Sequence, residues 1–331
     1  YQHEILNNEF ADADLLTTSD ELIRTIELLN QAREEKFKDA THEALKSEHD
    51  ALEQSIRFII VRFIKIRSGL ESERHISKLR KVFDLYLANY ADSEYYCESL
   101  YYYADIEFYM QNYENASKYY TQLINSCANL LDSSDSFDKD IYKDAVHGNF
   151  LSRINAENID CSDFSHDEFD TSEYTERPIP QSHLELIKAA DLYLHSRFGD
   201  KTPNESSDFF DKITWENSKC TVGKVYYLNN HFEEANQIFY QIIQNYPGSD
   251  IALVSADYIV RSLRARKQYA EMQKQILDFL NNSSLINTSV VSTYHYLNVL
   301  YFKNVLNQYM DEIPESVRNH SDNQTRSQNN P

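Results

Sequence analysis

Glycine and proline are scarce in this chain, which has five glycines and six prolines in 331 residues. The glycines stand apart from one another, at Gly69, Gly148, Gly199, Gly223 and Gly248. A phosphate-binding loop needs clustered glycines so that its backbone can approach the ligand, so the sequence excludes Rossmann and P-loop nucleotide sites. A fold built on β-hairpins would need more glycine at its turns. Both shortages favour a helical protein.

Long apolar runs are also missing, and basic residues are outnumbered by acidic ones. The longest apolar cluster, at 56–66, is interrupted by Arg57, Arg62 and Lys65. A membrane-spanning helix needs about 20 apolar residues, so we expect no membrane span. The chain carries 53 acidic residues against 32 Lys and Arg, a net charge of −21. Nucleic-acid binding requires concentrated positive charge, so we expect protein partners and no nucleic acid.

Recognisable catalytic, cofactor and metal motifs are absent from the sequence. It contains no HExxH, GxSxG or CxxC, and its 11 histidines follow no ligand spacing. Residues 158–180 hold seven acids and no Lys or Arg before Arg177, but lack the alternating ligands and central Gly of a calcium loop. We therefore predict an exposed loop there and no catalytic, cofactor or metal site. An enzyme with its site at this insert is the rival interpretation.

Four cysteines, Cys97, Cys127, Cys161 and Cys220, show no zinc-binding spacing with histidine. Their even number permits disulfides without requiring them. Because free cysteines are usually small buried side chains, we favour that interpretation and leave the pairing open.

What the sequence does contain is a repeat. At an offset of 156, residues 83–116 lie over 239–272, with Tyr90 on Tyr246. At an offset of 119, the pairs are Ala104 on Gly223, Tyr113 on Phe232, Ala116 on Ala235 and Tyr120 on Phe239. Self-similarity at fixed offsets is typical of an array of equivalent supersecondary units.

The segment "KCTVGKVYYLNNHFEEANQIFYQIIQNYP" resembles the tetratricopeptide repeat, a helix–turn–helix unit of 34 residues. Small residues at Gly223 and Ala235 let its two helices approach, and Phe239 fills the space beside them. Weaker copies occupy 97–130 and 253–286. The resemblance implies an all-α fold, a superhelical array of antiparallel helix hairpins (an α-solenoid).

The end of this repeat has its own signals. Tyr246 closes the second helix and Pro247 prevents its continuation. Ser249 and Asp250 then cap the next helix.

We predict five regions along the chain. They are a flexible segment at 1–17, helical or repeat-like segments at 18–130, divergent helices at 131–204 containing the acidic insert 158–180, C-terminal repeats at 205–312, and a disordered tail at 313–331. Outside the repeats, predicted helices lie at 18–39 (with a Ser/Asp cap), 41–68, 72–90, 139–157, 182–198, 205–229 and 290–310.

In the tetratricopeptide family the first helix of each repeat lines a groove. The equivalent positions here are Tyr101, Asp105, Phe108, Cys220, Lys224, Tyr227, Asp257, Arg261 and Arg264. We predict that Tyr101, Phe108, Lys224, Tyr227, Arg261 and Arg264 bind a partner, and that the three cations receive an acidic segment or a terminal carboxylate. The alternative is that these cations are solvated or paired with neighbouring acids. They do not reproduce the Lys/Asn clamp of chaperone-binding repeats.

The pattern "F..II..YP.S..A..A" resembles bacterial envelope repeat proteins: the lipoprotein of the outer-membrane barrel assembly machinery, the periplasmic partner of the Tol system, and gliding-motility proteins. The resemblance implies a non-enzymatic scaffold in the periplasm or at the outer membrane. Because the chain begins with Tyr1 rather than Met, we expect a trimmed product, compatible with a lipid anchor on a precursor. A cytosolic adaptor or co-chaperone is the alternative.

Overall fold

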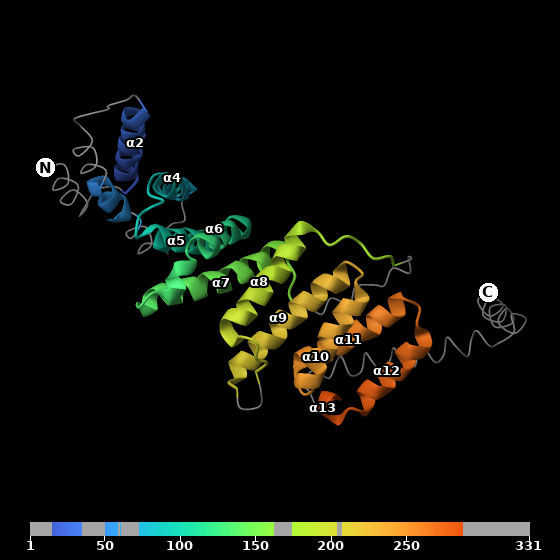
Figure 1. The fold of residues 1–331 in the computed structure, drawn as a ribbon. Coiled ribbons are helices and arrows are strands. Elements are labelled where there is room, and N and C mark those ends of the chain that lie inside the picture. The colour runs from blue at the N-terminus through green and yellow to red at the C-terminus, as the bar shows by residue number, and fades with distance from the viewer. Residues whose placement is uncertain are drawn as a thin grey trace, which may run out of the picture. The chain divides into compact units, whose positions relative to one another are not determined.

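The computed structural model describes residues 15–34, 50–58, 60, 73–161, 174–203 and 207–286, and all regular secondary structure in these residues is helical (Figure 1). The predicted all-α class is confirmed. The chain divides into two compact units, unit 1 (Tyr1–Ala156) and unit 2 (Glu157–Pro331), which are considered separately. None of the described helices is long and apolar enough to cross a bilayer.

Unit 1 is built around a helix hairpin. Its described elements are α2 (Leu15–Glu34), a helical stretch at 50–58, α4 (Glu73–Asn89), α5 (Tyr96–Tyr109), α6 (Tyr113–Ser126), the 3₁₀ helix η2 (Ala128–Asp132) and α7 (Ser136–Glu157). The hairpin is α5 packed on α6, and α4 packs against both α2 and α5. The helix predicted at 72–90 is thereby confirmed, as is the one predicted at 139–157.

One predicted helix start in unit 1 is wrong. We expected a Ser/Asp cap at the beginning of a helix at 18–39, but α2 already begins at Leu15. Ser19 lies inside α2 and is fully buried, one turn before the apolar face formed by Leu22, Ile23 and Ile26. A Ser before an apolar repeat favours a cap, but a small side chain also fits a tight helix contact.

Tyrosine rings fill the interior of unit 1. The ring of Tyr103 stacks on Phe83 from α4 at 4.6 Å between centroids and on Tyr119 from α6 at 4.1 Å. The hydroxyls of Tyr103 and Tyr119 both donate to Asp84, at 3.1 and 3.2 Å. A tyrosine can bury its ring while its hydroxyl finds a polar partner, as Tyr103 and Tyr119 do here.

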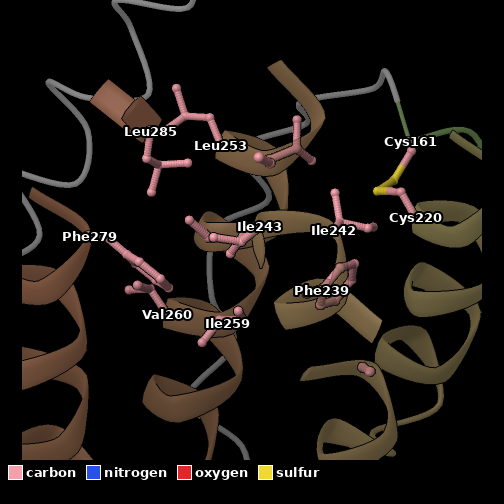
Figure 2. Packing of buried hydrophobic residues seen from close by; sticks show 14 of the residues in the cluster. Cys161, Cys220, Phe239, Ile242, Ile243, Leu253, Ile259, Val260, Phe279 and Leu285 are labelled. Carbon is pink, nitrogen blue, oxygen red and sulfur yellow. A yellow bond between two sulfur atoms is a disulfide. The ribbon is translucent and has the colours of Figure 1, made fainter. Parts of the chain in front are cut away.

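Unit 2 is a row of consecutively packed helices, which Figure 1 draws in yellow-green to orange. Its elements are α8 (Gln181–Phe198), α9 (Phe209–Leu228), α10 (Phe232–Asn245), α11 (Asp250–Ala265), α12 (Tyr269–Asn281) and α13 (Ser283–Ile286). The core between them is apolar, and Figure 2 shows it running from Phe239 past Ile259 and Val260 to Phe279. Helices α9 and α10 form one hairpin and α11 and α12 a second.

The turns inside the three hairpins are equivalent. Each contains one residue with positive φ, namely Gln111 (59°), Asn230 (65°) and Lys267 (58°). The N–H of the next residue returns to a carbonyl five residues earlier, as in Asn112 to Glu107 (2.8 Å) and His231 to Tyr226 (3.0 Å). This is the hydrogen-bond pattern of a Schellman helix end, usually completed by glycine. The three turn residues recur at the offsets of 119 and 156 found in the sequence.

The corner between the two hairpins of unit 2 matches its prediction. Helix α10 ends at Asn245, with Tyr246 as its C-cap, and Pro247 follows. The Ser249 hydroxyl accepts a hydrogen bond from the Ala252 N–H at 3.0 Å, which caps α11.

Both pairs of cysteines form disulfides, so the favoured interpretation of free cysteines is wrong. Cys97 pairs with Cys127 (Cα–Cα 6.0 Å), and Cys161 pairs with Cys220 (5.9 Å). Cys97 lies in the first turn of α5, and Cys127 directly follows α6. An antiparallel hairpin brings these two ends together, which makes the first bond geometrically accessible.

Several predictions fall outside the described residues. They concern most of the flexible segment 1–17, most of the helix at 41–68, the centre of the acidic insert, the helix at 290–310 and the tail at 313–331.

Candidate partner-binding surface

The six predicted partner-binding residues belong to two separate sets. Tyr101 and Phe108 lie on α5 in unit 1, whereas the other four lie on α9 and α11 in unit 2: Lys224, Tyr227, Arg261 and Arg264. Each set is therefore a candidate surface of its own.

The unit 1 set is aromatic and half-buried. Tyr101 and Phe108 are two turns apart and share one face of α5. Their rings are held by aromatic neighbours, Tyr120 at 6.4 Å from Tyr101 and Tyr113 at 5.4 Å from Phe108. Asp105, between them on the same face, is also half-buried. The face can offer two partly exposed rings and one carboxylate to a partner.

An ion pair between a buried carboxylate and a partly exposed guanidinium fixes α5 behind this face. The Glu107 carboxylate is fully buried and accepts two hydrogen bonds from the Arg80 guanidinium of α4, at 2.6 and 2.8 Å. The Asn112 side chain donates a third, at 2.6 Å. Hydrogen bonding to Glu107 raises the pKa of Arg80. Glu107 stands where the second hairpin has Tyr226, at the offset of 119, and Arg80 and Asn112 compensate for its burial.

Lys224 is not an open groove cation. Its side chain is 9% exposed, and its ammonium group donates a hydrogen bond to the backbone carbonyl of Asp160. One turn earlier on α9, Cys220 is fully buried in its disulfide with Cys161. This part of α9 is covered by the chain's own residues.

Arg261 and Tyr227 lie together between α9 and α11. Arg261, 7% exposed, donates to the Asp257 carboxylate at 2.6 Å. The Tyr227 ring packs edge-on against Phe232 (5.4 Å) and Tyr258 (4.9 Å). Burial raises the pKa of Tyr227, with Arg261 acting in the opposite direction. For Arg261 the structure thus matches the alternative, pairing with a neighbouring acid.

Arg264 is the half-buried cation of the set and lies in the last turn of α11. Reception of an acidic partner by the three cations remains a prediction. To bind an acidic partner, Lys224 would have to leave the Asp160 carbonyl, and Arg261 would have to leave the Asp257 carboxylate.

The α9–α10 turn also contacts the extended segment at 174–177, and sequence analysis did not predict this contact. The Arg177 N–H donates to the Asn229 carbonyl at 3.0 Å, and the Arg177 carbonyl accepts from His231 at 2.8 Å. The Asn230 side chain donates to the Thr175 carbonyl at 2.8 Å. The only sequence signal was indirect: Cys161 and Cys220 could have indicated that the insert returns to α9.

Unit 2 also has an open cleft of about 410 Å³ where α8, α9 and α10 meet. Its lining mixes both charges, with Asp191 and Asp200 beside Lys201 and Lys219, and Trp215 forms part of the wall. Within the described residues no three His, Cys, Asp or Glu side chains gather to hold a metal ion. Because the lining carries both positive and negative side chains, its charge does not favour one class of ligand.

Comparison with known proteins identifies the two best-formed hairpins. Residues 98–129 and 222–249 match the family model of the tetratricopeptide repeat, and cover nearly all of α5 with α6, and the C-terminal end of α9 with α10. No curated protein and no solved structure matches the chain. Two of the three predicted repeats are thus confirmed as tetratricopeptide repeats. The third, at 253–286, is a hairpin of α11 and α12 without a family match.

Proposed function

We propose that this protein is a non-enzymatic scaffold that holds a partner polypeptide in a multiprotein complex. The observation that carries the proposal is the presence of two tetratricopeptide hairpins, each with a partly aromatic helix face on α5 or α9. Helix hairpins of this kind present helix faces suited to binding an extended or helical segment. Half-buried aromatic residues such as Phe108 are favoured anchors in such contacts.

We further propose that the complex belongs to the bacterial cell envelope, in the periplasm or at the outer membrane. The two disulfides support this location, because disulfides persist in oxidising compartments and are rare in the cytosol. The sequence resemblance to envelope repeat proteins points the same way, toward a motility or outer-membrane assembly machine. The disulfides count against the alternative of a cytosolic adaptor.

The scaffold proposal can be tested by site-specific photo-cross-linking in the native cell. A photoreactive residue at Phe108 or Arg264 should cross-link to the same partner polypeptide. Tyr109, which is 52% exposed and next to Phe108, and Leu277, 39% exposed on α12, are matched controls on other faces. Equal cross-linking from all four positions would show that the helix faces do not select the partner.

The location needs a separate measurement. Release of the protein with the periplasmic contents after osmotic shock, or its recovery with outer membranes, is the expected result. Recovery with cytosolic markers, with all four thiols reduced, would contradict it.

A further inference from the structure

One face of α9 is covered by a non-helical segment of the same chain. Cys220, Lys224 and Tyr227 recur at a spacing of four and three residues, so they share this face. Cys161 is bonded to Cys220, and the Asp160 carbonyl accepts a hydrogen bond from Lys224. Tyr174 lies close enough to Tyr227 to raise the pKa of its hydroxyl further. We call residues 159–161 and 174–177 together the strap.

Apart from the disulfide at Cys161, the strap is held mainly by contacts that any extended peptide could make. At 174–177 it has no regular secondary structure, and its backbone N–H and carbonyl groups bond to the α9–α10 turn through Asn229, Asn230 and His231. The one aromatic anchor is Tyr174, whose ring meets Phe232 edge-on at 6.0 Å. Backbone hydrogen bonds and one inserted ring are the usual means of binding an extended peptide.

The charges of the two sides are complementary. The face of α9 presents Lys224, and Arg261 of α11, which is paired with Asp257, lies near Tyr227. The strap carries Asp160 and Glu176 against Arg177, and the sequence from 158 to 176 has seven acids and no Lys or Arg. A cation on a buried helix face is stable only when oxygen atoms satisfy it, so this surface favours an acidic occupant over a neutral one.

We propose that the face of α9 is a docking surface for an extended, acidic peptide carrying an aromatic residue, and that the strap occupies it in the free protein. A partner segment of that chemistry must then compete with the strap. The inference rests on the proposed scaffold function and assigns the chemical class of the partner.

The disulfide gives the strap its advantage in this competition. A segment tethered by a short loop acts at an effective concentration of about millimolar, and a covalent bond at Cys161 keeps its first piece from leaving at all. A peptide of the same sequence added in solution therefore cannot displace the strap from the oxidised protein. Breaking the disulfide should make the binding of the added peptide measurable.

The test uses the purified full chain and a fluorescent synthetic peptide of residues 157–177 that carries Cys161→Ser. Binding is followed by fluorescence anisotropy. The opened variant is Cys161→Ser/Cys220→Ser/Tyr174→Ala, which loosens the strap at both ends. The matched control is Cys97→Ser/Cys127→Ser, which removes the other disulfide. We expect at least a ten-fold lower Kd for the opened variant than for the wild type or the control.

Two further arms identify the surface. Lys224→Met in the opened variant should abolish the gain, as should a peptide whose acidic residues are replaced by their amides. Equal peptide affinity for the opened variant and the wild type would overturn the proposal. This result would leave the scaffold function untouched, because photo-cross-linking tests that function independently.

A measurement on the wild type keeps the proposal testable if the opened variant does not fold. The Arg177 amide, bonded to the Asn229 carbonyl, should exchange its hydrogen at least ten-fold faster than the amides in the middle of α10. Such exchange would show that the strap detaches while the hairpin stays folded. Equal rates would make the strap an inseparable part of unit 2 and overturn the proposal.

Discussion

The backbone of Gly223 on α9 lies directly against the ring of Phe239 on α10. A Cβ atom added at Gly223 would be 2.7 Å from Cε1 of that ring, closer than any real contact. The same relationship joins Gly148 of α7 to Tyr120 of α6, with a Cβ 2.5 Å from the ring. In both places a small residue meets an aromatic one, and the helices are close because the glycine has no side chain.

Gly223→Ala should therefore destabilise unit 2. Overpacking typically costs about 1–3 kcal/mol, against a gain of about 1 kcal/mol in helix propensity, so a net loss of about 1 kcal/mol is expected. Trp215 is the only tryptophan and lies in unit 2, so urea unfolding followed by its fluorescence reports on this unit. Gly248→Ala, whose Cβ would have no neighbour closer than 3.7 Å, is the control. Equal behaviour of the two variants would contradict the close contact.

Lys267→Gly should stabilise the second hairpin of unit 2. A left-handed conformation costs a residue with a Cβ about 1–2 kcal/mol, and the greater freedom of glycine in the unfolded chain offsets part of the gain. A net increase of about 0.5–1 kcal/mol is expected in the same fluorescence assay. Lys274→Gly, within α12, should instead lower the stability by about 1 kcal/mol. If both substitutions destabilise, the turn does not have the conformation described.

Glu107→Gln should weaken unit 1. The substitution keeps the shape of the side chain but leaves the Arg80 guanidinium without a carboxylate. Hydrogen bonds to charged groups contribute about 1.5–3 kcal/mol, and Arg80 is partly exposed, so a loss of about 2 kcal/mol is expected in urea unfolding followed by circular dichroism. Glu271→Gln, on an exposed pair 3.9 Å apart, should change nothing measurable. If Glu107→Gln left the free energy of unfolding unchanged, solvent would compensate for the loss of the ion pair.

Glu216 should make the stability of unit 2 depend on pH. Its side chain is 3% exposed, and its Oε2 has no hydrogen-bond partner among the described residues. Burial raises its pKa above the ordinary value of 4.5, although a hydrogen bond from Ser249 partly opposes this shift. The folded protein then binds the proton more tightly than the unfolded chain does, so stability falls as pH rises from 4.5 through the folded pKa.

Glu216→Gln should consequently be more stable than the wild type at pH 7. The difference should shrink on acidification and vanish below pH 4.5, where the wild-type carboxyl is protonated in both states. Parallel fluorescence melts across pH 4–8 measure this difference. A variant that is less stable at neutral pH would show that the charged carboxylate is satisfied in the folded state.

The two disulfides should be found in the native protein and should differ in their contribution to the free energy of unfolding. Peptide mapping without reduction should recover the pairs Cys97–Cys127 and Cys161–Cys220. The bonds close loops of 30 and 59 residues, and loop-closure entropy gives about 3.5 and about 4 kcal/mol respectively. Replacing each pair by serine and measuring urea unfolding tests this order. Alkylation of free thiols in unreduced, denatured protein would contradict the pairing.

The fold was predictable wherever local signals repeat. The spacing of small and aromatic residues gave the hairpins, and Tyr246, Pro247 and Ser249 gave the corner between them. The start of α2 was not predictable, because Ser19 satisfies a capping pattern while occupying a buried position. The even number of cysteines permitted the disulfide at Cys161, but the repeat pattern gave no position for that residue, because it lies outside the repeats.

The candidate surface was predictable by position but not by environment. Equivalence to the groove positions of the tetratricopeptide family placed Lys224 and Tyr227 on one face of α9, and the structure agrees. Sequence alone could not show that Asp160 and Tyr174 return to cover this face, because the contacts are long-range and mostly between backbone groups. The pairing of Arg261 with Asp257, four residues apart on one helix, was within reach of simple charge patterning.

The placement of the two covalent bridges has a mechanical consequence. Each bridge closes within a single unit, so a load applied to the two ends of the chain bypasses the residues between the bonded sulfurs. For the loop from Cys161 to Cys220, 59 residues at about 3.5 Å each, roughly 200 Å of contour length, are withheld from extension. Under such a load the helices outside the two bridged loops would extend, while the residues between the bonded sulfurs carry no tension.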